Sequence, residues 1–340
     1  MYRNAGTDEI ELAMTESGKT YSFNEDHDEK LPAQHWFQES DEGMILFIVF
    51  YTQACRWSRC LGCNLPSLCS KFHVAYDSIM DQIDVIFSNP EVLKYRDRIS
   101  KLIISNNGSI LDEDTFSSTA LMYLMSKLNR NFVKLSSISI ETRPEYIDYS
   151  ELDFLSRALK EGLTPTFMEL AVGFEAFDDE IRNTHLKKGL DLGVLEKSVK
   201  QMAKFGFRLK CYLMLKPVPG ISREAAVKDV QSALLYLDRL SHAYGIPINA
   251  HINPTYVARG TALEEAFAAG HYHPPTLHDT VRVALAAKGT RVSVFIGLYD
   301  EGLAVPNGSF IRPGPGDQHM IEEMEKFNRI QNFRVLENLL

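Results

Sequence analysis

Six short apolar runs alternate along this chain with segments of helical periodicity. The runs occupy residues 44–52, 101–105, 136–141, 168–174, 208–215 and 247–252. Repeated strand-then-helix alternation is typical of a parallel sheet whose right-handed crossovers place the helices on its outer side. Six units at this spacing predict an α/β fold of the partial (β/α)6 barrel type. A doubly wound open sheet is the alternative that periodicity alone leaves open.

The segments on either side of this repeat have a different character. Residues 1–42 hold 11 acidic and 3 basic residues, whereas the rest of the chain holds 34 and 33. We therefore expect an acidic N-terminal arm over residues 1–42, the barrel over 43–290 and an extension over 291–340. Within that extension, an apolar run at 291–298 and a helix near 317–330 are expected to close the open side of the barrel.

Composition limits the compartment and the kinds of partner. The longest apolar run has eight residues and is too short to span a membrane. No export signal is visible and the five cysteines show no regular pairing, so we expect a reducing, cytoplasmic location. The nearly neutral body lacks the broad basic stripe of a protein that grips nucleic acid alone.

Three cysteines, Cys55, Cys60 and Cys63, lie within nine residues directly after the first predicted strand. Their C-x4-C-x2-C spacing suits a structural zinc site or a plant-type [2Fe–2S] cluster, each completed by a further ligand such as Cys69. It also suits a [4Fe–4S] cluster with only three protein ligands and one open iron. Spacing alone does not separate zinc from iron–sulfur.

Context favours the cluster with an open iron. A chain of 340 residues with 45% hydrophobic content has ample core and does not need a zinc loop to hold it together. An electron-carrying ferredoxin would be short and would lack six strand–helix units. On this hypothesis Cys69 is not a ligand, and Cys211 is a buried core thiol.

Polar residues follow several other predicted strands. They are Asn107, Gly108 and Ser109 after the second, Glu141 at the end of the third, Glu175 and Lys187 after the fourth, and Asn253 after the sixth. Because the carboxyl ends of parallel strands meet at one edge, these residues are expected near the cysteine loop. A glycine lets the backbone approach a ligand closely, and a carboxylate at a strand end suits ribose hydroxyls. Taken singly, each also suits an ordinary turn or a surface ion pair.

Together these residues resemble the radical S-adenosylmethionine (SAM) enzymes. The resemblance rests on the three-cysteine loop, on Asn107-Gly108-Ser109 and on Gly173-Phe174-Glu175. Within that class, Glu141-Thr-Arg143-Pro-Glu145 is similar to the ETRP stretch of the elongator catalytic subunit group. Closer still is the radical SAM subunit of archaeosine synthase, through Lys210–Pro217, Glu224–Ala226, Asn253–Pro254, Gly260–Thr261 and Tyr272–Pro275.

The resemblance implies the cofactors and their ligands. Cys55, Cys60 and Cys63 would hold a [4Fe–4S] cluster whose fourth iron is chelated by SAM. Asn107, Gly108 and Ser109 would contact the methionine amino group. Glu175 and Lys187 stand where oxygen-independent coproporphyrinogen oxidases place a glutamine and an arginine that contact SAM. At position 187 a lysine keeps the charge of an arginine but loses its bidentate fork. Glu141 and Asn253 would add polar contacts.

The implied activity is reductive cleavage of SAM to a 5′-deoxyadenosyl radical that abstracts hydrogen from a substrate. The implied substrate is a small molecule or tRNA-linked group, that is, a modified tRNA base or a related metabolite. The implied partners are an electron donor of the flavodoxin or ferredoxin type and a protein that helps to bring the substrate. A non-catalytic iron–sulfur electron-transfer protein or a structural zinc protein is the competing class.

Two features depart from the radical SAM pattern. The usual spacing is C-x3-C-x2-C, and this loop has one extra residue. Gly62 occupies the position before the last cysteine, where an apolar or aromatic residue normally backs the adenine. Trp57 or the sixth predicted strand is then expected to support the adenine.

Overall fold

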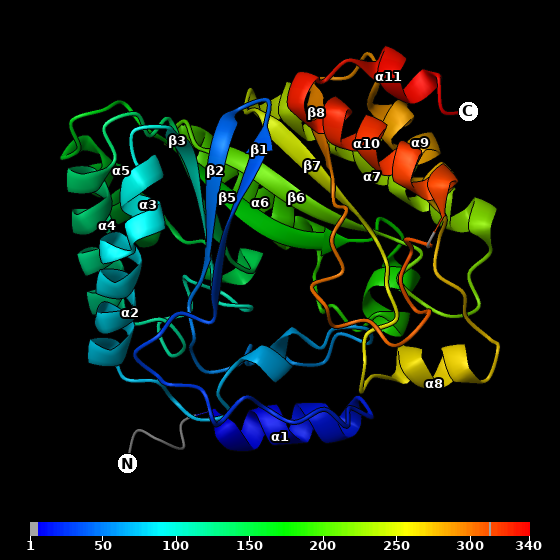
Figure 1. The fold of residues 1–340 in the computed structure, drawn as a ribbon, viewed down its shortest axis with the longest axis horizontal. Helices are drawn as coiled ribbons and strands as arrows, with labels where there is room; N and C mark the ends of the chain where they lie inside the picture. Colours follow the sequence, from blue (N-terminus) through cyan, green and yellow to red (C-terminus); the bar gives the residue numbers. More distant parts are fainter. Residues whose placement is uncertain (1–5, 313) are drawn as a thin grey trace.

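A single eight-stranded sheet dominates the computed structural model, which describes residues 6–312 and 314–340 (Figure 1). The strands lie in chain order: β1 (Gln34–Ser40), β2 (Gly43–Val49), β3 (Ile99–Ser105), β4 (Ser137–Glu141), β5 (Phe167–Glu175), β6 (Arg208–Leu215), β7 (Ile248–Pro254) and β8 (Val292–Ile296). β1 is antiparallel to β2, and every pair from β2 to β8 is parallel. Strand order without a reversal excludes the doubly wound alternative and confirms the predicted partial barrel.

The six predicted strands are β2 to β7, and two further strands extend the sheet. The run at 291–298 supplies β8, which pairs with β7. The predicted acidic arm contains a helix, α1 (Thr7–Glu16), and the edge strand β1. Its first five residues lie outside the described part of the chain.

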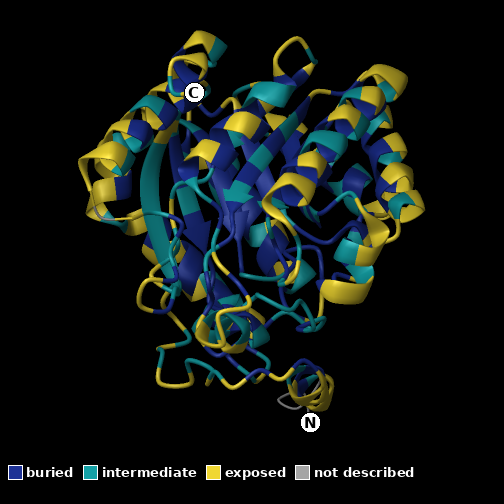
Figure 2. Ribbon diagram, turned by 90° about the vertical axis from the view of Figure 1, so that its right-hand side faces the viewer, coloured by how far each residue is buried: buried dark blue, intermediate teal, exposed yellow. Residues whose placement is uncertain are grey.

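Crossover helices cover the outer face of the sheet, and their apolar sides are buried against it (Figure 2). The crossover helices are α2 (Tyr76–Ser88), α3 (Pro90–Tyr95), α4 (Ser118–Asn131), α5 (Tyr149–Lys160), α6 (Leu192–Lys204), α7 (Arg223–Tyr244) and α9 (Leu277–Ala284). Further helices are α8 (Ala262–Ala268), whose Leu263 belongs to a separate apolar cluster, α10 (Pro315–Ile330) and α11 (Phe333–Glu337). The sequence sets the ends of α7 clearly. The Ser222 hydroxyl accepts a hydrogen bond from the Ala225 amide at 3.1 Å, and Gly245 ends the helix with a left-handed backbone. In the described part of the chain, every helix is too short or too polar to cross a membrane.

The amino ends of the strands are closed by buried charges. The Lys101 ammonium lies 2.9 Å from a Glu169 carboxylate oxygen and also contacts Glu42. Arg208 pairs with the same Glu42 at 3.0 Å. Buried ions are tolerated when each charge has partners of opposite sign, as these do. Ligand access is therefore left to the carboxyl edge.

The open side of the sheet is closed by α10, as predicted for the helix near 317–330. This helix packs against both edge strands, β1 and β8. The Asn328 side chain exchanges hydrogen bonds of 2.8 and 2.9 Å with the backbone of Ile296, the last residue of β8. The Asn328 carbonyl accepts a hydrogen bond of 3.1 Å from the Asp41 amide beside β1.

Truncation of a buried leucine on α7 tests the packing of the helical layer. Leu237 is 0% exposed, whereas Leu235 on the same helix is 56% exposed. Leu237→Ala is expected to lower the free energy of unfolding by about 2–5 kcal/mol, because it leaves a cavity against the sheet. Leu235→Ala is the matched control and should change it by less than about 0.5 kcal/mol. Equal losses in urea denaturation would contradict the placement of α7.

Candidate functional site at the carboxyl edge

Left-handed backbone conformations gather in the loops at the carboxyl edge of the sheet. Ser58, Asn107, Glu175, Lys187 and Lys216 have φ values between 40° and 67°. They belong to the loops that follow β2, β3, β5 and β6. Such conformations cost energy in residues with a side chain and are common at functional sites. The strain therefore marks the edge at which the sequence predicts a ligand.

The cysteine loop is fixed to the segment that follows β5. The Leu61 amide donates to the Leu186 carbonyl at 2.9 Å, and the Trp57 indole N–H donates to the Lys187 carbonyl at 2.8 Å. Inside the loop, the Cys63 amide donates to the Cys60 carbonyl at 3.2 Å. Cys55, Cys60 and Cys63 are partly exposed, whereas Cys69 and Cys211 are buried.

The three thiols lie in surroundings that suit an anionic metal centre. Burial raises the pKa of Cys63 to about 12, and the Lys19 charge opposes that rise. Burial also raises the pKa of Cys60, against the charges of Lys188, Arg143 and Lys19. A metal or cluster must displace these protons, and the nearby cations would then balance the thiolates. Among the described residues, no three His, Cys, Asp or Glu side chains already stand in a metal-binding arrangement.

The loop after β3 brings its backbone against the cysteine loop. A side chain at Gly108 would begin 3.4 Å from the Cα of Cys55, so the two loops touch at these residues. The Gly108 amide donates to the Asn106 side chain at 3.1 Å. The Ser109 hydroxyl accepts a hydrogen bond of 3.0 Å from the Arg143 amide. The predicted triplet 107–109 thus joins the cysteine loop to the segment after β4.

Glu175, one of the SAM contacts proposed from sequence, forms an ion pair with Lys188. The Lys188 ammonium lies 2.9 Å from the Glu175 carboxylate, in a space that Gly173 leaves open because a Cβ there would meet both groups. Burial lowers the pKa of Lys188, but Glu175 and Cys60 more than offset that effect and leave it raised. The half-buried Lys187 side chain instead donates a solvent-exposed hydrogen bond of 3.3 Å to the Glu16 carbonyl. The sequence does not show which of the two adjacent lysines turns towards Glu175, because only the turn geometry distinguishes them.

Glu141 and Asn253 lie on the concave face. The Glu141 carboxylate accepts hydrogen bonds from the Ser105 and Tyr212 hydroxyls. Burial raises the pKa of Glu141, and these two hydrogen bonds act in the opposite direction. The Asn253 side chain stands across from Gly297, which has no side chain to cover it. Both predicted residues therefore face the interior of the barrel, below the loops.

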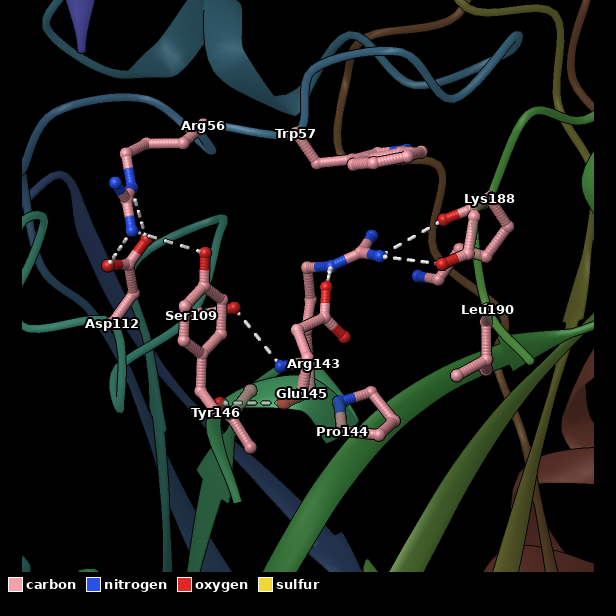
Figure 3. A network of polar contacts seen from close by, with 12 residues as sticks. Arg56, Trp57, Ser109, Asp112, Arg143, Pro144, Glu145, Tyr146, Lys188 and Leu190 are labelled. Carbon is pink, nitrogen blue, oxygen red and sulfur yellow. Dashed lines mark hydrogen bonds and ion pairs between the residues drawn. The ribbon is translucent and has the colours of Figure 1, made fainter. Parts of the chain in front are cut away.

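The Arg143 side chain, which follows β4, packs against the ring of Trp57 in the cysteine loop (Figure 3). The Arg143 guanidinium lies 4.8 Å from the centre of the Trp57 ring and donates to the Lys188 carbonyl at 3.1 Å. Its ion-pair partner is Glu145. Trp57, one of the two expected adenine supports, is thus held in place by the loops around it.

A second ion pair in the same view was not predicted. Arg56, directly after Cys55, donates two hydrogen bonds of 2.8 Å to Asp112 and pairs with Asp114 at 2.7 Å. The bidentate geometry fixes the cysteine loop to the loop after β3. No sequence signal connects residues so far apart.

Below the loops, Lys210 carries a buried ammonium on the concave face. Its ammonium lies 5.6 Å from the ring centre of Tyr212 and 5.7 Å from that of Phe295. Burial and the Lys101 charge lower the pKa of Lys210 to about 8, against the opposing influence of Glu169, Glu141 and Glu42. The unfolded chain binds more protons above that pH, so stability should rise with pH until the unfolded lysine also loses its proton.

Removal of Lys210 tests that electrostatic environment. Lys210→Met has no amine at this position and should lack this pH dependence of stability. Between about pH 7 and pH 10.5, the free energy of unfolding of the wild type should therefore rise by on the order of 2 kcal/mol relative to that of Lys210→Met. Urea denaturation at each pH measures the difference. Lys228→Met, at an exposed position on α7, is the control and should keep the wild-type pH dependence. A pH dependence shared by both variants would contradict a depressed lysine pKa.

The amino-acid sequence is similar to those of several proteins that carry a functional name. The chain is 27% identical over 249 residues to archaeosine synthase subunit beta of Methanosarcina acetivorans, covering 72% of this chain and 66% of that protein. It is 23% identical over 319 residues to the subunit of the same name from Thermococcus kodakarensis, covering 90% and 92%. Elongator complex protein 3 of Mus musculus is 25% identical over 169 residues, which are 48% of this chain and 28% of that protein.

The chain matches no protein-family model. A solved structure of Elp3 from Methanocaldococcus infernus shares 19% identity with it at a TM-score of 0.49, over 74% of this chain and 58% of that chain. At these values the structural likeness is weak. The sequence relatives confirm the predicted resemblance to the archaeosine synthase subunits and to elongator complex protein 3, and they support an enzyme.

Proposed function

We propose that this protein holds a [4Fe–4S] cluster through Cys55, Cys60 and Cys63 and uses it to cleave SAM. The observation that carries the proposal is the contact between the cysteine loop and the Gly108 backbone, with Lys188 and Arg143 beside Cys60. Three soft thiolate donors suit iron, and the cations offset their charge. When bound and reduced, such a cluster supplies the electron that splits SAM and gives the hydrogen-abstracting 5′-deoxyadenosyl radical.

The loops around the cysteines would hold SAM. Residues Asn107, Gly108 and Ser109 offer backbone and amide groups to the methionine end, because Gly108 permits a close approach to Cys55. Glu175 and Lys188 offer one charge of each sign to the amino acid moiety or the ribose. Trp57 offers a flat surface to the adenine, since Gly62 has no side chain to do so. Glu141 and Asn253 complete the polar concave face beneath.

The substrate class we propose is a modified base in tRNA, as the name of the archaeosine synthase relatives suggests. Those relatives are named as subunits, which supports a partner protein for this chain too. A partner that carries the RNA also fits the charge of residues 43–340, which is close to neutral. An electron donor of the flavodoxin or ferredoxin type would reduce the cluster.

Anaerobic reconstitution with iron and sulfide tests the cofactor proposal. We expect about four iron atoms per chain, an EPR signal of the reduced cluster that changes on addition of SAM, and 5′-deoxyadenosine after reduction. Cys60→Ala should lose the cluster because it removes a ligand. Cys69→Ala is the matched control and should keep it. Stoichiometric zinc, or loss of the cluster in Cys69→Ala, would contradict a three-cysteine site with an open iron.

The two adjacent lysines make a second, internally controlled test. Lys188→Met should weaken binding of SAM to the reconstituted protein about tenfold or more, because a buried charge-assisted contact is worth about 1.5–3 kcal/mol. Lys187→Met should bind within about twofold of the wild type, since the Lys187 ammonium is directed to the Glu16 carbonyl and not to Glu175. Equilibrium dialysis measures both, with iron content as the check on the cluster. Equal weakening in the two variants would overturn the assignment of Lys188.

A further inference from the structure

The N-terminal arm lies along the cysteine loop (Figure 1). Ile10 and Ala13 of α1 are fully buried in a small apolar cluster with Ala54 and Cys69. Further along the arm, the Asn24 amide donates to the Cys69 carbonyl at 3.0 Å. The arm is thus anchored before and after the stretch that passes over the three cysteines.

Gly260, which precedes α8, lies against residues 20 and 21 of the arm and fixes their path. The Thr20 amide donates to the Gly260 carbonyl at 3.0 Å. Gly260 has a φ of 71°, and a Cβ there would lie 2.8 Å from the Tyr21 backbone nitrogen. A side chain at residue 260 would therefore push the arm away. The fold leaves room for the arm in this position.

The arm carries one buried cation to the cysteine loop. Lys19 is only 7% exposed, and its ammonium donates a hydrogen bond of 2.7 Å to the Ser58 carbonyl, between Cys55 and Cys60. Lys30, the other lysine of the arm, lies in an exposed ion pair with Asp81. A buried charge needs a compensating charge, and the Ser58 carbonyl supplies only a dipole. The nearby thiolates of the loaded site would supply that charge.

The arm also carries a hydroxyl that has no acceptor within the described chain. The Tyr21 hydroxyl is buried and makes no hydrogen bond there. Tyr21 lines one pocket with Asn64, the residue after Cys63, and after burial the charges of Cys63, Cys69, Cys55 and Cys60 raise the pKa of Tyr21 most. A buried O–H without an acceptor costs free energy. Cluster and thiolate sulfur atoms accept hydrogen bonds.

We infer that Lys19 and Tyr21 belong to the cluster site, where the arm supplies a positive charge and an O–H donor to sulfur. This inference rests on the proposed function. A cation and a hydrogen-bond donor stabilise the more negative, reduced form of a cluster, so both residues raise its reduction potential. Lys19 and Tyr21 act by stabilising the reduced cluster and do not bind its iron atoms.

The test is an anaerobic redox titration of the reconstituted protein, followed by EPR. Lys19→Met should lower the midpoint potential by about 59 mV, the equivalent of a tenfold change in a one-electron equilibrium. Lys19→Arg should restore most of the shift because it keeps the charge. Tyr21→Phe should lower the potential by a smaller amount, because it removes only the hydroxyl. Lys30→Met is the control and should match the wild type.

Iron content and the unfolding midpoint are measured on every variant, so that a folding defect is recognised. Wild-type potentials in both Lys19→Met and Tyr21→Phe, with four irons bound, would overturn the inference and leave the proposed function intact. A wild-type protein that takes up no iron–sulfur cluster would overturn both. If Lys19→Met fails to fold, the result for Tyr21→Phe alone decides the inference in the same way.

Discussion

Parallel pairing in chain order is the constraint on which the rest of the structure depends. Because β2 to β8 all run the same way, every crossover starts at the carboxyl edge, and residues separated by more than a hundred positions meet there. The cysteine loop, the triplet 107–109 and the Glu175–Lys188 pair are neighbours for this reason alone. The amino ends cannot serve the same purpose, since Lys101, Glu169 and Glu42 fill them with paired charges.

The charge around the cysteine loop is opposite in sign to the net charge of the chain. A protein of net charge −9 gathers three cations, Lys19, Arg143 and Lys188, around Cys60. Burial favours the neutral thiols, and the cations favour the thiolates. Burial and the neighbouring cations thus act in opposite directions on the Cys60 and Cys63 thiols, and the same cations would offset the charge of metal-bound thiolates.

The fold and the cysteine loop were within reach of the sequence, because strand alternation and ligand spacing are local signals. β1 was missed because its residues are mostly polar and only half-buried at the sheet edge. The choice between Lys187 and Lys188 lay beyond the sequence for a different reason: the backbone at Lys187 is left-handed, and it is Lys188 that reaches Glu175. The Arg56–Asp112 pair and the approach of Lys19 to the loop depend on the tertiary path of the chain, which no spacing encodes. Binding of a cluster and of SAM stays a prediction.

The bridge made by α10 has a consequence for the newly made chain. Asn328 joins the segment at Asp41 to the end of β8, so the free edge of β1 stays uncovered until residue 328 has been made. At ribosomal rates of roughly 5–20 residues per second, that wait is roughly 15–60 s. During it, an unpaired strand edge is open to pairing with other chains. The acidic residues Glu39 in β1 and Asp41 beside it put negative charge on that edge and so discourage two nascent copies from joining.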